Sequence, residues 1–342
     1  MERYDAGRWD RAPVQAVVVG EEEKGRQDAA GHARCLDCER FLYNVRPRAS
    51  HAKLPIAVAL ILSQTGEVMS DPTYALGRSD DEHARLTEQA SFLRPLTERF
   101  FKKAGIAPGM KVLDVGSGVG DVAFLVADLV GQDGKVVGVD MDGGALEKAR
   151  KRAQQMKLRN VEFIQGDIRS VVLPRPFDAA VGRLVLLYFA DPVTALAQIA
   201  AQVRPKGIVA FQEMEMNVAA ARATYGDSLL GKVAMTIYRT FAASEVRVNM
   251  GGELLHTYVK AGLGVPELMG EFVVGGGPDF AGYSWLANTL RSLAPAAGKL
   301  GISLEPLGDL DTLTQRLRSE AATENRDFWS PPYVGAFVRV AS

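Results

Sequence analysis

The sequence predicts an α/β protein built on a doubly wound, mostly parallel sheet with helical insertions. The first reason is alternation, because short apolar strand patterns such as KVLDV and KVVGVD are separated by helical patterns. The second is that these strand patterns are apolar throughout, which is typical of strands covered by helices on both faces. The third is a glycine turn, GSGVG at 116–120, between the first strand and the next helix. Ligands of such sheets bind beyond the carboxyl ends of the strands.

The first 68 residues lack this alternation. Charged residues are scattered there without a helical or strand period, and patterned sequence begins after Met69. We expect Met69 to be the natural start and residues 1–68 to be a disordered or non-native extension, with a genuine accessory segment as the alternative. Residues 69–342 are expected to form the folded domain.

The expected elements of that domain follow in order. Ser79 with Glu82 resembles a capping box and predicts a covering helix over 79–103, which AGIAPG ends. The core over 110–215 is then expected to contain KVLDV, a helix over 120–130, KVVGVD, a helix over 143–157, VEFIQ, FDAAVG, a helix over 191–203 and GIVAFQE.

The alternation breaks beyond residue 217. Helical insertions are expected over 217–262 and 279–324, with a strand near 266–274 and a closing strand, YVGAFVRV, over 333–340. The insertions are rich in aromatic residues. Most of these are expected in the core, and a minority is expected to line an apolar pocket for a small molecule. Arg239, Arg247 and Arg291 could bind an acidic acceptor, with solvated surface positions as the alternative.

Composition excludes some classes of partner. Forty basic and 41 acidic residues leave a formal charge of −1, whereas nucleic-acid binders carry a surplus of Lys and Arg. The longest apolar run, LPIAVALILS, is shorter than the roughly 20 residues that span a bilayer. We therefore expect no nucleic-acid partner and no membrane partner. Two cysteines can form at most one disulfide, which is too few to stabilise a chain of this size. This indicates a reducing, cytoplasmic location.

His32, Cys35 and Cys38 have a spacing that would suit zinc. No fold signals surround these residues, and they lie in the expected extension. We expect no metal site.

The stretch VLDVGSGVGD, residues 112–121, is the most informative part of the sequence. Glycine adopts positive φ without strain and lets a ligand approach the backbone. A dinucleotide fingerprint would read G-x-G-x-x-G, whereas Asp121 takes the place of the third glycine here. Asp114 ends the preceding strand, where its carboxylate would repel a pyrophosphate. These features favour a ligand with a positive group, and a purely structural turn is the alternative.

Two further acidic residues follow at similar spacing. Asp140 ends KVVGVD, 26 residues after Asp114, and Asp167 follows FIQG, 27 residues after Asp140. One βαβ unit takes about 30 residues, so the three carboxylates are expected at successive strand ends on one edge of the sheet. Buried carboxylates need hydrogen-bond donors. The pattern predicts a site for a ligand that carries an ammonium group, vicinal hydroxyls or an exocyclic amine.

The stretches VLDVGSGVGD, VVGVDMD and FIQGDI together resemble the class I S-adenosylmethionine-dependent methyltransferases. The resemblance is to the small-molecule branch related to the ubiquinone and menaquinone biosynthesis methyltransferases. It covers about 74–215 and, more loosely, WSPPYVGAFVRV near the end of the chain. It implies a Rossmann-like, mostly parallel seven-stranded sheet, with S-adenosyl-L-methionine as the cofactor.

The resemblance also implies roles for individual residues. The methionine end of the cofactor would be held by Asp114, Gly116, Ser117 and Gly118, and covered by Tyr74, Arg85 and Gln89. The ribose and adenine would be held by Asp140, Met141, Asp167 and Ile168. Arg183, at the end of FDAAVGR, would lie between cofactor and acceptor.

Methyl transfer from a sulfonium requires alignment of the reactants more than enzyme nucleophiles. A general base helps when the acceptor is a hydroxyl. The candidates are His256 in GGELLHTYVKAG, with a surface histidine as the alternative, and Glu213 in FQEME. One of Glu213 and Glu215, at the end of this strand, is expected to face the acceptor.

The predicted function is methyl transfer to a small, largely apolar organic acceptor at oxygen, carbon or nitrogen. Two alternatives stay open. One is a nicotinamide-dependent oxidoreductase, which Asp114 and Asp121 disfavour. The other is a relative that binds the cofactor without methylating. The oligomeric state is not legible from the sequence, and a homodimer is one option.

Overall fold

The computed structural model describes residues 80–342, apart from 175, 217–220 and 222–223. The expected extension 1–68, with its histidine and cysteines, lies outside the described residues, as does Ser79 of the predicted capping box.

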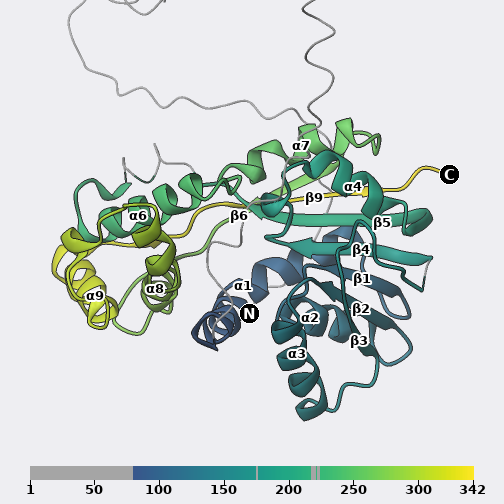
Figure 1. Ribbon diagram of the computed structural model, residues 1–342, viewed down its shortest axis with the longest axis horizontal. Coiled ribbons are helices and arrows are strands. Elements are labelled where there is room, and N and C mark those ends of the chain that lie inside the picture. Colours follow the sequence, from purple (N-terminus) through teal and green to yellow (C-terminus); the bar gives the residue numbers. More distant parts are fainter. Residues whose placement is uncertain (1–79, 175, 217–220, 222–223) are drawn as a thin grey trace, which may run out of the picture. The chain divides into compact units, whose positions relative to one another are not determined.

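Seven strands form one mixed sheet in the order β3-β2-β1-β4-β5-β9-β6 (Figure 1). Neighbouring strands from β3 to β5 pair in parallel, and β9 pairs antiparallel with both β5 and β6. The predicted α/β fold with a mostly parallel, Rossmann-like sheet is therefore confirmed. In sheet order the strands are β3 (Val161–Gln165), β2 (Lys135–Asp140), β1 (Lys111–Val115), β4 (Phe177–Arg183), β5 (Val203–Met214), β9 (Tyr333–Arg339) and β6 (Glu267–Glu271).

The strand order reverses at β1, which lies between β2 and β4. Connections on the two sides of such a point leave in opposite directions, and a crevice opens beyond the carboxyl ends of the central strands. Asp114, the fourth residue of β1, is paired with Gly138 of β2 and Val181 of β4. The glycine loop that follows β1 therefore begins at the position where this fold class binds ligands.

Helices cover both faces of the sheet. On one face, α1 (Asp80–Ala104), α2 (Asp121–Val130) and α3 (Gly143–Gln155) share an apolar core with the strands. On the other, α4 (Pro192–Ala200) and α7 (Met250–Lys260) pack in a second core. Burial on both faces explains why the parallel strands read as continuous apolar runs.

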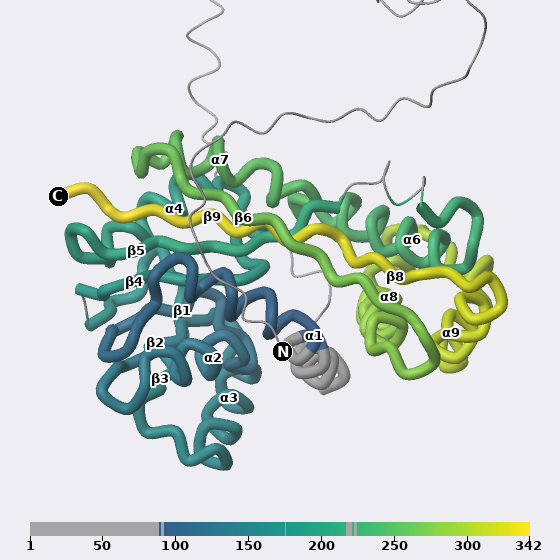
Figure 2. Tube along the Cα trace, turned by 180° about the vertical axis from the view of Figure 1, so that it is seen from behind, coloured from purple at the N-terminus to yellow at the C-terminus, as the bar shows by residue number. Residues whose placement is uncertain are grey.

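Further helices form the insertions after β5. They are α6 (Leu229–Ala243), α8 (Gly282–Lys299), the short helix η3 (Glu305–Leu307) and α9 (Leu313–Glu324). Figure 1 shows α6, α8 and α9 grouped together on one side of the sheet. Figure 2 shows the chain returning from this group into β9 by way of β8 (Phe328–Trp329), which pairs with β7 (Val274–Gly275).

Two predicted boundaries were wrong. The helix expected over 191–203 ends at Ala200. Val203 already belongs to β5, where it pairs with Phe177 of β4. The strand expected near 266–274 divides into β6 and β7, which belong to different sheets.

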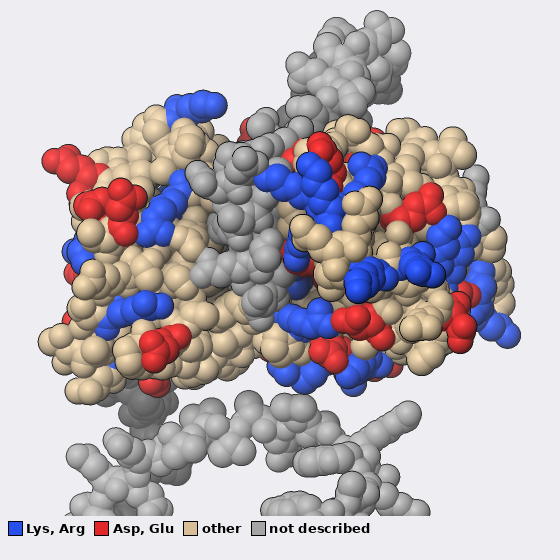
Figure 3. Space-filling view, turned by 90° about the horizontal axis from the view of Figure 1, so that it is seen from below, with Lys and Arg blue, Asp and Glu red and all other residues tan. Residues whose placement is uncertain are grey.

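The surface of the described part agrees with the balanced composition. On the face seen in Figure 3, basic and acidic side chains are interspersed. Within the described ranges, no helix combines the length and apolar character that crossing a bilayer demands.

The contact between α1 and β9 leads to a prediction about stability. A Cβ atom on Gly335 would lie 2.3 Å from the Phe100 ring, so this fully buried ring fills the space above the glycine. Replacing Phe100 by Ala should lower the free energy of unfolding by about 3–5 kcal/mol in urea denaturation. Val172→Ala is the control, because that side chain is 92% exposed. A loss for Phe100→Ala no larger than for the control would contradict this packing.

Candidate active site

The loop after β1 is fixed by backbone hydrogen bonds to the end of β2. The amides of Gly116 and Ser117 donate to the carbonyl of Val139 at 2.8 and 3.0 Å. Gly116 has a φ of 67°, and a Cβ there would lie 2.5 Å from a methyl carbon of Val185. Gly118 has a φ of 50° and has no atom within 4 Å of its would-be Cβ. The loop therefore needs glycine at 116 for contact with the neighbouring loop, and leaves open space beside 118.

Asp140 connects this loop to the start of α3. Its carboxylate accepts one hydrogen bond from the Gly118 amide and another from the Asp142 amide, both at 2.8 Å. Asp142 in turn caps α3 by accepting from the amides of Gly144 and Ala145. The carboxylate of Asp140 is thus held at the carboxyl end of β2, with its position set by two backbone segments.

Asp114 is almost completely buried behind the glycine loop. Neither carboxylate oxygen has a hydrogen-bond partner of good geometry within the described part of the chain, although the amide of Ala123 approaches and favours the charged form. Desolvation raises the pKa of Asp114 well above its usual range, and the charge of Arg183 acts in the opposite direction. A buried acid in this state is costly unless donors reach it.

Arg183, the last residue of β4, lies close to this acid. Its Nη1 donates to the Thr97 hydroxyl at 3.2 Å, and that hydroxyl donates to Gln212 at 2.8 Å. Desolvation lowers the pKa of Arg183, while Asp121, Tyr333 and Asp114 favour its charged form. Arg183 therefore supplies positive charge among acids at the reversal of the strand order.

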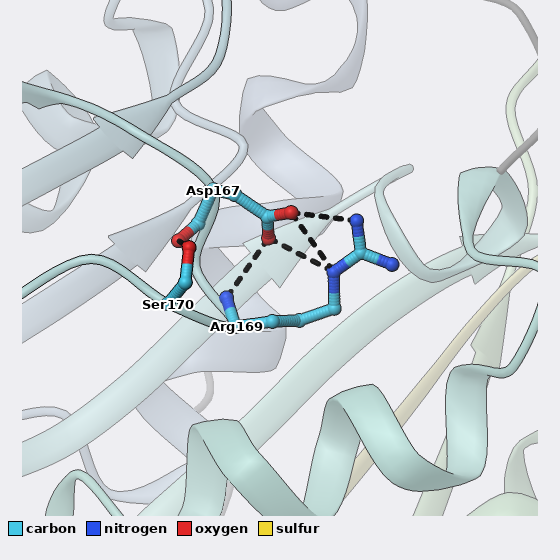
Figure 4. A network of polar contacts seen from close by, with 3 residues as sticks. All are labelled: Asp167, Arg169 and Ser170. Atoms are coloured by element: carbon cyan, nitrogen blue, oxygen red, sulfur yellow. Dashed lines mark hydrogen bonds and ion pairs between the residues drawn. The ribbon is translucent and has the colours of Figure 1, made fainter. Parts of the chain in front are cut away.

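Asp167 lies in the loop after β3 and is held by Arg169 (Figure 4). Its two oxygens accept from the Arg169 amide at 2.9 Å, from Nε at 2.9 and 3.1 Å, and from Nη2 at 2.6 Å. These bonds lower the pKa of Asp167. The guanidinium also lies 5.5 Å from the centroid of the Phe189 ring. Asp167 is therefore charged, and its acceptor positions are engaged within its own loop.

A cavity of about 710 Å³ lies beyond these strand ends. Its walls include these residues expected to hold a cofactor: Gln89, Gly116, Ser117, Gly118, Asp140, Met141, Asp167, Ile168 and Arg183. Asp114 lies behind the wall, not in it. Tyr74 and the side chain of Arg85 lie outside the described residues.

The two ends of the cavity differ in polarity. Around the strand ends, the wall includes Arg183 and four acidic residues, Asp121, Asp140, Asp142 and Asp167. The carboxylate of Asp121 is paired with Arg152 at 2.7 Å. The other end is formed by β5, the insertions and β8, and it is mostly apolar and aromatic. Its walls include Met214, Met216, Met235, Phe241, Trp285 and Trp329. The rings of Trp329 and Phe272 are stacked, with their centroids 5.1 Å apart. Both residues line the cavity and are about half exposed, so this aromatic pair lies at its edge.

Glu213 is fully buried and is not among the wall residues of the cavity. One carboxylate oxygen accepts from the amides of Val185 and Leu186, at 3.1 and 2.8 Å, at the start of the short helix η2 (Leu186–Tyr188). The other oxygen has no partner within the described chain. Desolvation raises the pKa of Glu213 to about 8. The neighbouring residue that lines the cavity is Met214.

His256 is exposed on α7 and does not line the cavity. The structure therefore does not bring either candidate base, His256 or Glu213, to the cavity. It does bring residues there that the sequence reading did not single out. Asp142 was signalled by its place as an N-cap, and Phe189 by the apolar run after β4. Of the three arginines that the sequence offered as partners of an acidic acceptor, Arg239, Arg247 and Arg291, only Arg247 is among the described wall residues.

Glu213 leads to a prediction about pH. Its pKa is about 8 when folded and 4.5 ordinarily, so between these values the folded state holds a proton that the unfolded chain has lost. The free energy of unfolding therefore falls as pH rises through this window. Glu213→Gln removes the titration, and the Tm difference, variant minus wild type, should increase from about pH 5 to about pH 8. Thermal melts followed by circular dichroism measure it.

Glu305→Gln is the matched control, because Glu305 is exposed. Its Tm difference should stay flat over the same pH range. A flat difference for Glu213→Gln as well would show that Glu213 is ionised in the folded protein at neutral pH.

Comparison with known proteins now adds to the geometry. A family model described as a methyltransferase domain matches residues 106–260. An aklanonic acid methyltransferase from Streptomyces sp. is 34% identical over 140 residues, which are 41% of this chain and 63% of that protein. An arsenite methyltransferase from Halobacterium salinarum is 40% identical over 32% of this chain and 29% of its own length. A demethylmenaquinone methyltransferase from Lactococcus lactis is 31% identical over 32% of this chain and 43% of its own length.

This chain therefore spans less than two thirds of each of these curated relatives. A solved S-adenosylmethionine-dependent methyltransferase from Aquifex aeolicus superposes with a TM-score of 0.44 at 16% identity, over 77% of this chain and all of that one. The family match covers the glycine loop, the successive acids at the strand ends and the first insertion. The chain thus carries a class I S-adenosylmethionine-dependent methyltransferase domain.

Proposed function

We propose that this protein transfers a methyl group from S-adenosylmethionine to a small, largely apolar organic acceptor. The observation that carries the proposal is the polarity of one cavity. Acidic residues and the glycine loop line the end next to the carboxyl ends of the strands, which we call the inner end. Methionine and aromatic side chains line the other end. A cationic nucleoside suits the first lining and an apolar acceptor the second.

The residues at the inner end fit the groups that S-adenosylmethionine presents. Asp140 ends β2 in the cavity wall, and its carboxylate oxygens are acceptors of the kind that ribose hydroxyls need. Met141 and Ile168 are also in the cavity wall and provide apolar surface there. The cofactor, when bound, supplies a methyl carbon made electrophilic by its sulfonium. Everything else in the reaction is positioning and exclusion of water.

The adenine end needs one rearrangement. The four hydrogen bonds from Arg169 engage both oxygens of Asp167. To accept the exocyclic amine of adenine, Asp167 must release at least one of them. Arg169 thereby competes with the cofactor for the same carboxylate.

The chain's own contribution to the chemistry is alignment. The last residue of β4, Arg183, and the two residues after it, Leu184 and Val185, belong to the wall. Neither His256 nor Glu213 is in the wall. The proposal therefore gives neither residue the role of general base.

The names of the relatives support a small-molecule acceptor. Two of them are named for aklanonic acid and demethylmenaquinone, which are organic molecules. A third is named for arsenite. The methionine and aromatic lining favours an organic acceptor over a small inorganic one, because apolar walls gain free energy only by burying apolar surface.

The first prediction of the proposal concerns Asp140. Replacing it by Ala removes acceptors for the ribose hydroxyls, so the Kd for S-adenosylhomocysteine should rise about ten- to a hundred-fold in titration calorimetry. Asp133→Ala is the control, because Asp133 is exposed and lies outside the cavity wall. An unchanged Kd for Asp140→Ala would remove this residue from the cofactor site.

The second prediction concerns the reaction itself. Wild-type protein incubated with methyl-labelled S-adenosylmethionine and an extract of small organic metabolites should transfer label to an apolar product. Mass spectrometry detects it. Clear binding of S-adenosylhomocysteine without any labelled product would favour a relative that binds the cofactor without methylating.

A further inference from the structure

One basic side chain stands out among the wall residues that follow β5. Among the described wall residues from Met214 to the end of the chain, Arg247 is the single Asp, Glu, His, Lys or Arg. The acids of the cavity wall, and Arg183, all lie at the strand ends of the sheet or just beyond them. The mostly apolar part of the wall that follows β5 therefore contains one cation.

Arg247 is held firmly in this position. Its Nε and Nη2 donate to the carbonyls of Phe189 and Ala190, at 3.2 and 2.7 Å, just after η2. Its backbone amide donates to the carbonyl of Leu187. The next residue, Val248, accepts from the amide of Met216 at the extension of β5. Arg247 is thus fixed by the segments that follow β4 and β5.

Part of its donor capacity is not used. A guanidinium has five N–H donors, and the contacts to Phe189, Ala190 and Glu253 engage three of them within the described part of the chain. Glu253 is 3.3 Å away and about one third exposed, so this ion pair is weak. Asp191, which also acts on Arg247 electrostatically, is engaged as the N-cap of α4.

An apolar acceptor that fills this end would displace the water next to Arg247. A guanidinium left facing an apolar ligand would lose solvation without gaining a partner, which is costly. The cost disappears when the ligand carries an anionic oxygen, because charge-assisted hydrogen bonds from Arg to an oxyanion are strong. Two other polar groups in the wall are already engaged, since the Tyr225 hydroxyl bonds the Trp329 backbone and Thr289 bonds the Trp285 carbonyl. The buried Trp285 indole N–H has no partner within the described part of the chain, but it is uncharged.

We infer that the acceptor is an apolar acid, with a carboxylate or another oxyanion held by Arg247 and an apolar frame held by the aromatic wall. This inference rests on the proposed function, because it names the substrate class of the same cavity. Arg247 is then a residue that determines specificity and leaves the cofactor site unchanged.

The test uses two fluorescent probes of similar shape. Anilinonaphthalene sulfonate carries an anion, and phenylnaphthylamine is its uncharged parent. Both are titrated into full-length protein saturated with S-adenosylhomocysteine. The anionic probe should bind the wild type more tightly than the neutral one. In Arg247→Gln its Kd should rise about tenfold or more, with the Kd of the neutral probe changed less than about twofold.

Two further variants sharpen the result. Glu253→Gln removes the competing carboxylate and should tighten the anionic probe while leaving the neutral one unchanged. Arg239→Gln is the matched control, because Arg239 is exposed on α6 and outside the cavity wall. It should change neither probe.

Three outcomes would overturn the inference. One is equal loss of both probes in Arg247→Gln, which would mean that Arg247 only shapes the cavity. The second is equal affinity of both probes for the wild type, and the third is an Arg239→Gln effect as large as that of Arg247→Gln. Failure of the proposed function is distinct, because it appears as a wild type that does not bind S-adenosylhomocysteine at all.

Discussion

The site depends on the glycine loop being tied to the neighbouring strand. Gly116 and Ser117 donate to Val139, and the Gly118 amide donates to Asp140. These bonds fold the chain back across the end of β2 before α2 begins, at the point where the strand order reverses. Backbone geometry thus places the carboxylate beside the loop, and only glycine fits at 116 against Val185. The remainder of the cavity is arranged around this fixed corner.

The separation of charge within the cavity follows from the fold. Parallel strands of one sheet end at the same edge, so acids that close successive strands gather there. The insertions lie beyond that edge and supply the apolar wall, because their amphipathic helices turn aromatic and methionine side chains inward. One cavity can therefore hold a cationic cofactor against acidic residues and, next to it, an apolar acceptor against apolar side chains.

The sequence allowed the strand-end acids to be predicted, since Asp114, Asp140 and Asp167 recur at the length of a βαβ unit. It did not reveal that Asp114 lies behind the wall, or that Asp167 is already paired with Arg169, because both depend on packing. The orientation of Glu213 was also beyond sequence reasoning. Residues 213 and 215 are two apart, so alternation puts them on the same face and cannot choose between them. Contacts with the start of η2 hold Glu213, and neither acid is in the cavity wall. Arg247 belongs to a loop whose position is set by distant segments.

The central claim is that the carboxylates at the strand ends accept hydrogen bonds from the nucleoside of the cofactor. A crystal structure of the complex with S-adenosylhomocysteine tests it most directly. The account predicts ribose hydroxyls within hydrogen-bond distance of Asp140 and the base between Met141 and Ile168. A nucleoside bound elsewhere, or an Asp140 carboxylate turned into solvent in that complex, would contradict it.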